Sequence, residues 1–223
     1  MTYQWDFTPV VANAPLLAQG LVNTLKVTGT ALACGLELGL AFALMRLSSR
    51  RWLSWPAGFI IEVFRTTPPL VQLFWMFFCL PVLFRISIPP ALSVLLSLTM
   101  YMIAITSETF RGALKSIASE QHDACIALGL TPRVKVLYVI FPQGLLRAAP
   151  PLLSNVVSLF KESALISSVG IADLMLVGQN ISTNTARPVE FLSAVGAIYF
   201  LVAFPLTRLV GVVETRMLRR YTY

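Results

Sequence analysis

The sequence predicts an all-α membrane protein, a single domain over residues 1–223 with five transmembrane helices. Two observations predict this class. Of the 223 residues, 57% are hydrophobic and only 12% are charged, whereas about a quarter of the residues of an ordinary soluble domain are charged. Apolar runs also recur at the length of about 20 residues that a helix needs to cross a bilayer. Five such helices are enough to bury an interhelical core within one domain.

The apolar runs give the expected spans, taken in chain order. Their approximate ranges are 19–45, 57–82, 90–111, 145–166 and 189–213. Small residues are frequent in the first span, which suits close contact with a neighbouring helix. The second span contains Pro68 and Pro69 after two threonines, a pattern that predicts a kink. We expect a short helix lying along the membrane after the fourth span, near residues 170–178.

The basic residues predict the orientation of these spans. Twelve of the 17 Lys and Arg residues form three clusters on alternate sides of the apolar runs. These clusters are Arg46, Arg50 and Arg51; Arg111, Lys115, Arg133, Lys135 and Arg147; and Arg208, Arg216, Arg219 and Arg220. Because cytoplasmic segments of membrane proteins are enriched in Lys and Arg, we place the N-terminus outside and the C-terminus inside. The net charge of +7 therefore reflects basic residues that orient the chain in membrane lipid. We expect no nucleic acid partner.

A cytoplasmic helix-turn-helix is expected between the third and fourth spans, over residues 116–142. Ser119 can cap its first helix, and Gly129 can end that helix in a left-handed turn. Thr131 and Pro132 supply an N-cap and a first-turn proline for the second helix, which we expect to end before Pro142. A membrane chain that only reverses direction needs a shorter loop. The segment therefore indicates a mechanical coupling element.

At this segment the chain resembles a known family. Residues 108–143 read ETFRGALKSIASEQHDACIALGLTPRVKVLYVIFPQ. This run resembles the cytoplasmic signature of the transmembrane subunits of binding-protein-dependent ABC importers, and among them the polar amino-acid uptake subfamily. Supporting blocks are EVFRTTPPLVQ at 62–72, PPLLSN at 150–155 and KESAL at 161–165. The family pattern has Glu-Ala-Ala where this chain has Asp123-Ala124-Cys125, which keeps a carboxylate and small side chains.

The resemblance implies a five-span permease of the bacterial cytoplasmic (inner) membrane that works with several partners. These are two copies of an ATP-binding cassette subunit, a second permease subunit that is identical or paralogous, and an extracytoplasmic solute-binding protein. No cofactor is expected on this chain, since ATP and Mg would bind to the ATPase subunit. The absence of a G-x-x-x-x-G-K-[ST] phosphate loop from the sequence agrees with this assignment.

The implied function is import of a polar amino acid or similar small zwitterion by alternating access, driven by ATP. The alternative from another class is a stand-alone secondary transporter or channel for a small solute. The sequence shows no inverted repeat of the kind that such transporters contain. An enzyme is not expected, because neither a Ser-His or Cys-His constellation nor an H-E-x-x-H motif occurs. Catalytic and metal-binding residues are therefore expected to be absent.

The candidate residues for coupling to the ATPase subunit lie in the helix-turn-helix. They are Gln121, Asp123, Ala124, Ala127, Leu128, Gly129 and Arg133. Ala124, Ala127 and Leu128 share one helical face, a small surface that can enter a groove of a partner. Gln121, Asp123 and Arg133 offer polar contacts at its rim. The competing interpretation is a well-capped cytoplasmic loop without a partner.

Charged residues near the inner ends of the spans are candidates for gating. Glu62 and Arg65 lie three residues apart on one helix and can pair, which lowers the cost of placing either in a membrane. Glu108 and Arg111 have the same spacing. We interpret both pairs as structural or gating ion pairs in preference to substrate contacts.

A second set of polar residues lies in the first and fourth spans. Glu37 is expected to face another helix or a water-filled cavity, with Lys26 and Lys161 as candidate neighbours, but the sequence does not assign its partner. Lys161 and Glu162 lie in the outer half of the fourth span, above Asn155 and Ser158. Adjacent residues on a helix point about 100° apart, so one of Lys161 and Glu162 is a candidate to face the substrate path. Bracing between helices is the alternative role for this group.

Overall fold

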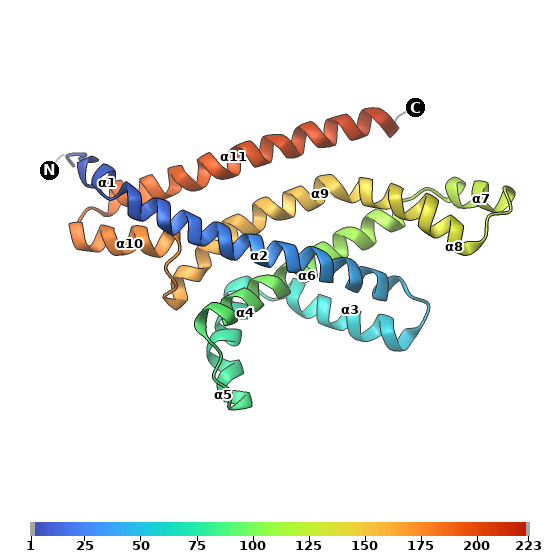
Figure 1. The fold of residues 1–223 in the computed structure, drawn as a ribbon, viewed down its shortest axis with the longest axis horizontal. Coiled ribbons are helices and arrows are strands. Elements are labelled where there is room, and N and C mark those ends of the chain that lie inside the picture. Colours follow the sequence, from blue (N-terminus) through green and yellow to red (C-terminus); the bar gives the residue numbers. More distant parts are fainter. Residues whose placement is uncertain (1–2, 222–223) are drawn as a thin grey trace.

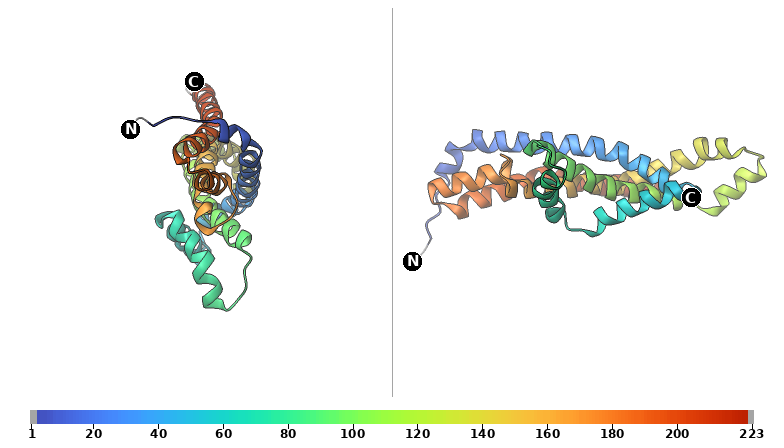
Figure 2. Two further views of the ribbon diagram at one scale, coloured as in Figure 1. Left: turned by 90° about the vertical axis from the view of Figure 1, so that its left-hand side faces the viewer. Right: turned by 90° about the horizontal axis from the view of Figure 1, so that it is seen from below.

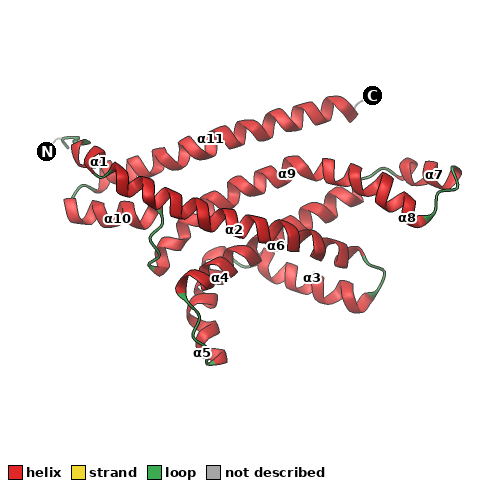
Figure 3. Ribbon diagram, in the orientation of Figure 1, coloured by secondary structure: helices red, strands yellow, loops and turns green. Residues whose placement is uncertain are grey.

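The chain folds into an elongated bundle of helices, in a computed structural model that describes residues 3–221 and, for 218–221, the backbone alone. Within that part every regular element is helical (Figure 3). The N-terminal end lies at one end of the bundle, and α11 finishes toward the other (Figure 1). This arrangement agrees with an odd number of membrane crossings.

Four helical runs are long and apolar enough to cross a membrane. They are α2 (Ala14–Leu47), α6 (Pro90–Lys115), the run Pro132–Val169 and α11 (Pro188–Tyr221). A fifth span is a broken pair, in which α3 (Arg51–Thr66) and the run 69–84 meet at 109°. The break falls at Pro68 and Pro69, as the sequence predicts. The run after it comprises α4 (Pro69–Phe74), a π-helix (Trp75–Cys79) and α5 (Leu80–Phe84).

The fourth predicted span is part of a longer helical run than expected. Its successive parts are α8 (Pro132–Val134), a π-helix (Lys135–Ile140), α9 (Phe141–Glu162) and a 3-10 turn (Ser163–Val169). The expectation that a helix ends before Pro142 is therefore wrong. The residues just before Pro142 are wound as a π-helix, whose wider turn keeps the backbone helical where a proline ring would clash with the preceding turn.

The core between α2 and α6 depends on glycines that allow the two backbones to approach. A Cβ atom at Gly35 would lie 2.3 Å from Met102 Cβ, and one at Gly39 would lie 2.0 Å from Thr106 Oγ1. The Thr106 hydroxyl lies 2.9 Å from the Gly35 carbonyl oxygen and 2.6 Å from that of Met102. These contacts hold α2 and α6 in a fixed register, which sets the relative depth of charged residues at their ends.

The end of the bundle that contains the N-terminal segment is closed by α1 (Thr8–Ala12) and α10 (Leu174–Thr185). The α10 helix runs parallel to the long axis of the bundle, beside α2 and α11 (Figure 1, Figure 2). It therefore does not lie along the membrane surface, contrary to the expectation from the sequence. Asp173 caps α10 by accepting a hydrogen bond from Leu176 N at 2.8 Å, and burial raises the pKa of its carboxyl. Thr24 on α2 accepts a hydrogen bond from Leu174 N at 3.0 Å, which ties the two helices together.

A buried carboxylate that sequence reasoning missed holds the N-terminal segment at this end. Glu190, which is fully buried, accepts hydrogen bonds from the Tyr3 hydroxyl, from Asp6 N at 3.1 Å and from Arg187 at 3.2 Å. The Arg187 guanidinium also lies 3.7 Å from the Asp6 carboxylate. Hydrogen bonds from Thr8 hold the pKa of Asp6 below its usual range. The chain therefore joins its first residues to the beginning of its last span.

Candidate functional site

The helix-turn-helix between the third and fourth spans projects beyond the bundle (Figure 1, Figure 2). Its first helix is α7 (Ser119–Ala127), followed by a turn in which Gly129 has φ +65°. Leu130 N donates to Cys125 O at 3.0 Å, and Gly129 N donates to Ile126 O at 2.9 Å. These bonds satisfy the last carbonyls of α7 in the left-handed ending that a glycine makes accessible. The prediction that Gly129 ends the first helix in a left-handed turn is confirmed.

The capping of the two helices is predicted correctly in one case and wrongly in the other. The Thr131 hydroxyl accepts a hydrogen bond from Val134 N at 3.4 Å, as expected of an N-cap. The N-cap of α7 is Ala118, which makes no side-chain cap. The expectation that Ser119 caps α7 is wrong, because the helix begins one residue earlier and places Ser119 inside its first turn.

The segment is fastened to the bundle at its base. Arg147 on α9 donates a hydrogen bond to Ser116 O, and Gln143 lies 3.4 Å from Gln121. Gly144 allows close approach, because a Cβ atom there would lie 2.4 Å from Leu114 Cδ2. These contacts connect the segment directly to the adjoining ends of α6 and α9.

The predicted coupling residues lie on an exposed surface of the helix-turn-helix. Every predicted coupling residue is exposed, namely Gln121, Asp123, Ala124, Ala127, Leu128, Gly129 and Arg133. Large apolar side chains lie open beside them, with Leu128 75% and Ile126 66% exposed. Tyr138, in the π-helix that follows, is 76% exposed. Because exposed apolar surface rimmed by polar residues marks interaction sites, this face is suited to a protein partner.

The second feature of the site is an ion cluster centred on Glu108 of α6. Its carboxylate lies 2.7 Å from Arg46 Nη1 on α2 and 3.6 Å from Arg65 Nη1 on α3, and it accepts hydrogen bonds from Arg111 on its own helix. Glu62 lies 3.6 Å from Arg65. The predicted pairs of Glu62 with Arg65 and of Glu108 with Arg111 are therefore present, and Arg46 is an addition that sequence reasoning missed.

The cluster connects three helices through one carboxylate. The side chains of Arg46, Glu108 and Arg111 are each about a quarter exposed. Three guanidinium groups and two carboxylates leave the group positively charged. Partly buried charges of this kind are stable only when they are paired, so removal of the central carboxylate would leave three arginines facing one another.

A glutamine that sequence reasoning did not single out holds the break in the second span. Pro68 lacks the amide hydrogen that would continue the helix, which leaves the Phe64 carbonyl without its helical partner. Gln72, only 5% exposed, donates from Nε2 to Phe64 O at 2.6 Å and to Thr67 O at 2.8 Å. Its side chain thus reaches back across the break and fastens α4 to the end of α3, at the residue that precedes Arg65.

The polar residues predicted in the fourth span are only partly brought together. Asn155 donates to Thr109 Oγ1 at 3.0 Å and so braces α9 against α6. Ser158 and Glu162 are half-buried, while Lys161 is exposed. Where the structure describes hydrogen bonds and ion pairs, no direct contact joins Lys161 to Asn155.

The expectation that Glu37 faces another helix or a water-filled cavity stays a prediction, because the single chain leaves its side chain exposed. Glu37 is exposed on α2, and none of the described ion pairs joins it to Lys26 or Lys161. The side of α2 that faces α6 is occupied by Gly35 and Gly39. Lys26 is eleven residues away, which is about 16 Å along a helix and too far for contact.

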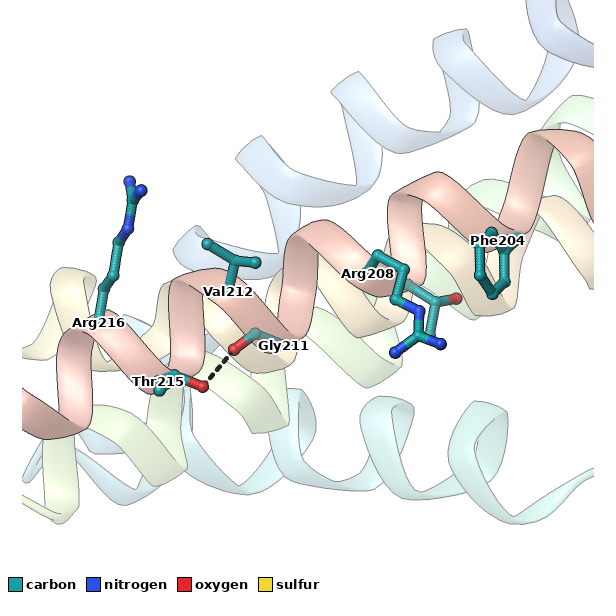
Figure 4. Close-up of a pocket in the computed structure, with 7 residues that line it drawn as sticks. Phe204, Arg208, Gly211, Val212, Thr215 and Arg216 are labelled. Atoms are coloured by element: carbon teal, nitrogen blue, oxygen red, sulfur yellow. Dashed lines mark hydrogen bonds between the residues drawn. The ribbon is translucent and has the colours of Figure 1, made fainter.

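The face of α11 toward its C-terminal end is also uncovered. A hollow of about 770 Å³ is lined by seven residues, all of them from α11. They are Phe204, Thr207, Arg208, Gly211, Val212, Thr215 and Arg216. Figure 4 shows Thr215 donating to the Gly211 carbonyl, at 2.7 Å, and Arg208 beside Phe204, with its guanidinium carbon 5.0 Å from the ring centre. Because a single helix lines it, this hollow is an unpartnered helix face.

Together these features define a class of protein: a membrane transport subunit with a projecting element for a partner. Residues 35–219 match the family described as "Binding-protein-dependent transport system inner membrane component". The match covers most of the chain, and the chain belongs to this family. In the family this is a membrane-embedded permease subunit of an ABC importer, and ATP hydrolysis lies on separate subunits.

The curated relatives agree over nearly their whole length. The chain is 32% identical over 206 residues to the probable amino-acid ABC transporter permease protein y4tG of Sinorhizobium fredii, which covers 92% of this chain and 89% of the relative. It is 30% identical over 221 residues to the glutamate/aspartate import permease protein GltK of Escherichia coli, covering 96% and 99%. It is 32% identical over 215 residues to the glutamine transport system permease protein GlnP of Escherichia coli K12, covering 96% and 98%.

Solved structures give the same result. The structure described as "Crystal structure of an amino acid ABC transporter with histidines" contains a chain that superposes with a TM-score of 0.91 at 33% identity, covering 96% of this chain and 100% of that one. An inward-facing structure of the MetNI methionine ABC transporter matches with a TM-score of 0.69 at 24% identity, which supports the fold alone. The resemblance found at residues 108–143 is confirmed.

Replacement of Gln72 by methionine tests the fastening of the second span. Gln72→Met keeps the length of the side chain but cannot donate, so the Phe64 and Thr67 carbonyls lose a buried partner. We expect the free energy of unfolding to fall by about 1–3 kcal/mol, measured by thermal unfolding in detergent. Gln179→Met, at an exposed position of α10, is the matched control. Equal melting temperatures for the two variants would show that the hydrogen bonds do not hold the break.

Replacement of Glu108 by glutamine tests the ion cluster. Glu108→Gln removes the charge that three arginines share, and we expect a loss of about 2 kcal/mol in the free energy of unfolding. Glu62→Gln removes one half-exposed partner of Arg65 and should cost less than about 1 kcal/mol. Chemical or thermal unfolding in detergent measures both. The cluster would have no central role if Glu62→Gln were as destabilising as Glu108→Gln.

Proposed function

We propose that this chain is the subunit through which an ATP-driven importer moves a polar amino acid or a similar small zwitterion across the inner membrane. The observation that carries the proposal is the projecting α7–α8 segment, whose apolar face is exposed among the residues that the structure describes. The substrate class is supported by the relatives named above, three of which are described as carrying amino acids or glutamine.

In this proposal the α7–α8 segment docks into a groove of the ATP-binding cassette subunit. Ala124, Ala127 and Leu128 provide the buried part of the contact, and Asp123 and Arg133 its polar rim. Two ATPase copies bind ATP and Mg between them, and their closure moves the segment. Because α8 continues into α9 without a break, the motion passes along one helix into the membrane.

The Glu108 cluster then acts at the inner side of the path. Arg46 and Arg65 attach α2 and α3 to α6, so these helices move as one body when α9 moves against them. Glu62 and Arg65, each close to half exposed, are the gating candidates that can exchange partners between the inward-facing and outward-facing states. Exchange of discrete ion pairs gives two stable arrangements, which alternating access requires.

The substrate path runs along the polar side of α9 and neighbouring polar positions. Ser158 and Lys161 share a helical face, and Lys161 is exposed in the single chain. Glu162, Asn155 and Glu37 are the remaining candidates. An exposed carboxylate in a span is costly in lipid, so Glu37 faces either a second permease subunit or the aqueous path in the assembly.

A second permease subunit, identical or paralogous, covers the open face of α11. Thr207, Gly211 and Thr215 follow one another at intervals of four residues along this face, and Figure 4 shows the last two. Small residues at this spacing let helices pack closely within membranes. An extracytoplasmic solute-binding protein delivers the substrate at the other end of the bundle, where the N-terminal segment is held by Glu190.

Two substitutions in the α7–α8 segment test the proposal. Asp123→Lys reverses the charge at the rim, and Gly129→Val forces a β-branched residue into a left-handed backbone position. We expect both variants to insert into the membrane but to lose the co-purifying ATPase subunit and most substrate-stimulated ATP hydrolysis. ATPase assays on affinity-purified complexes give the result.

Gly29→Val is the matched control, because a Cβ atom at Gly29 meets nothing within 4 Å. It should purify with the ATPase subunit and retain hydrolysis. Wild-type ATP hydrolysis and uptake in both Asp123→Lys and Gly129→Val would overturn the coupling role of the segment.

A further inference from the structure

The corner between α2 and α3 contains a hollow that the proposed transport mechanism does not use. Ser48, Arg51, Ser54 and Trp55 line this hollow, which has a volume of about 530 Å³. The corner lies at the same end of the bundle as the α7–α8 segment, which projects past it (Figure 1). The inference rests on the proposed function in one respect: there, this end of the bundle is the one at which the spans leave the membrane toward the ATPase partner. We propose that this corner binds the headgroup of an anionic phospholipid.

The polar groups of the corner suit a phosphate. Arg50 and Arg51 are exposed, and in the described part of the chain neither lies within ion-pair distance of a carboxylate. The Ser48 hydroxyl accepts a hydrogen bond from Arg50 N at 3.3 Å, which leaves its own hydrogen for another acceptor. A guanidinium group and a hydroxyl donor at one hollow are the groups that recognise phosphate oxygens.

An apolar strip continues from the hollow along α3. Trp52, Trp55 and Phe59 are 70%, 74% and 61% exposed, and they lie at spacings of three and four residues on one side of the helix. The rings of Trp55 and Phe59 stack with their centres 6.0 Å apart. Tryptophan prefers the boundary between headgroups and acyl chains. The strip therefore offers contact to acyl chains directly below a basic headgroup site.

This combination selects a lipid over other occupants. A free phosphate ion would use the arginines but not the apolar strip, and an apolar protein segment would leave both guanidinium groups unpaired. A zwitterionic headgroup carries its own cation beside the phosphate, which opposes binding next to Arg50 and Arg51. A net negative headgroup satisfies the charge, the hydroxyl and the aromatic strip together.

A lipid at this corner would also reach the ion cluster. Ser54, which lines the hollow, donates to the Arg46 carbonyl oxygen at 3.0 Å, and the Arg46 side chain holds Glu108 at 2.7 Å. The headgroup would thus fix the depth of the end of α2 that carries Arg46. The lipid composition of the membrane would thereby affect the positions of the three helices that the ion cluster joins.

The test is the binding of dioleoylphosphatidylglycerol to the assembled transporter, titrated by native mass spectrometry without ATP. We expect tighter binding of phosphatidylglycerol than of phosphatidylcholine. Arg51→Gln should weaken phosphatidylglycerol binding about fivefold, the contribution of one basic residue at a membrane surface. Trp55→Ala should weaken binding of both lipids, because it removes apolar contact and not charge.

Arg85→Gln is the control, since Arg85 is an exposed arginine in the loop after α5, remote from the corner. It should leave phosphatidylglycerol binding unchanged. Equal affinities in Arg51→Gln and Arg85→Gln would overturn the proposal. Competition by millimolar inorganic phosphate would instead identify a free-anion site, and loss of the ATPase subunit from Arg51→Gln would identify a protein interface; either result contradicts the lipid assignment. Because binding is measured without ATP, the outcome does not depend on the transport mechanism.

Discussion

The carboxylate of Glu108 holds three helices together toward the end of the bundle that carries the α7–α8 segment. It lies within 3.6 Å of guanidinium groups from α2, α3 and α6, so one side chain fixes the relative positions of three helices. The glycines of α2 set its register against α6, and the paired charges near the ends of these helices extend that register to α3. In the proposed mechanism these three helices form the unit that moves against α9.

Two departures from regular α-helix shape the second and fourth spans. The second span is broken at Pro68 and is held at 109° by the amide of Gln72. The fourth span avoids a break at Pro142 by winding the preceding residues as a π-helix, so it stays continuous with the projecting segment. Pro68 thus bends the second span, whereas Pro142 is accommodated within a continuous helical run. The difference is physical: a side chain satisfies the free carbonyl at the first site, and a wider backbone turn accommodates the ring at the second.

The sequence predicted most features that depend on local chemistry, although the Ser119 cap and the helix end before Pro142 were wrong. It missed contacts that depend on the alignment of helices. Gly129 and Thr131 were identifiable because turn geometry and capping are determined within a few residues. Glu62 with Arg65 and Glu108 with Arg111 followed from helical spacing. Arg46 could not be assigned to Glu108, because their contact requires the register that Gly35 and Gly39 set between α2 and α6. The partner of Glu37 could not be assigned for the same reason, since no sequence pattern shows which neighbouring helix lies beside a given side of a span.

In the proposed mechanism, solute movement through this chain is driven from outside it, by an ATPase acting on the α7–α8 segment. This can be measured by reconstitution in liposomes, with uptake of a labelled polar amino acid followed for the chain alone and for the chain with its ATPase and binding-protein partners. We expect no uptake by the chain alone and ATP-dependent uptake by the assembly. Uptake by the purified chain without ATP would contradict it and would identify a stand-alone secondary transporter or channel.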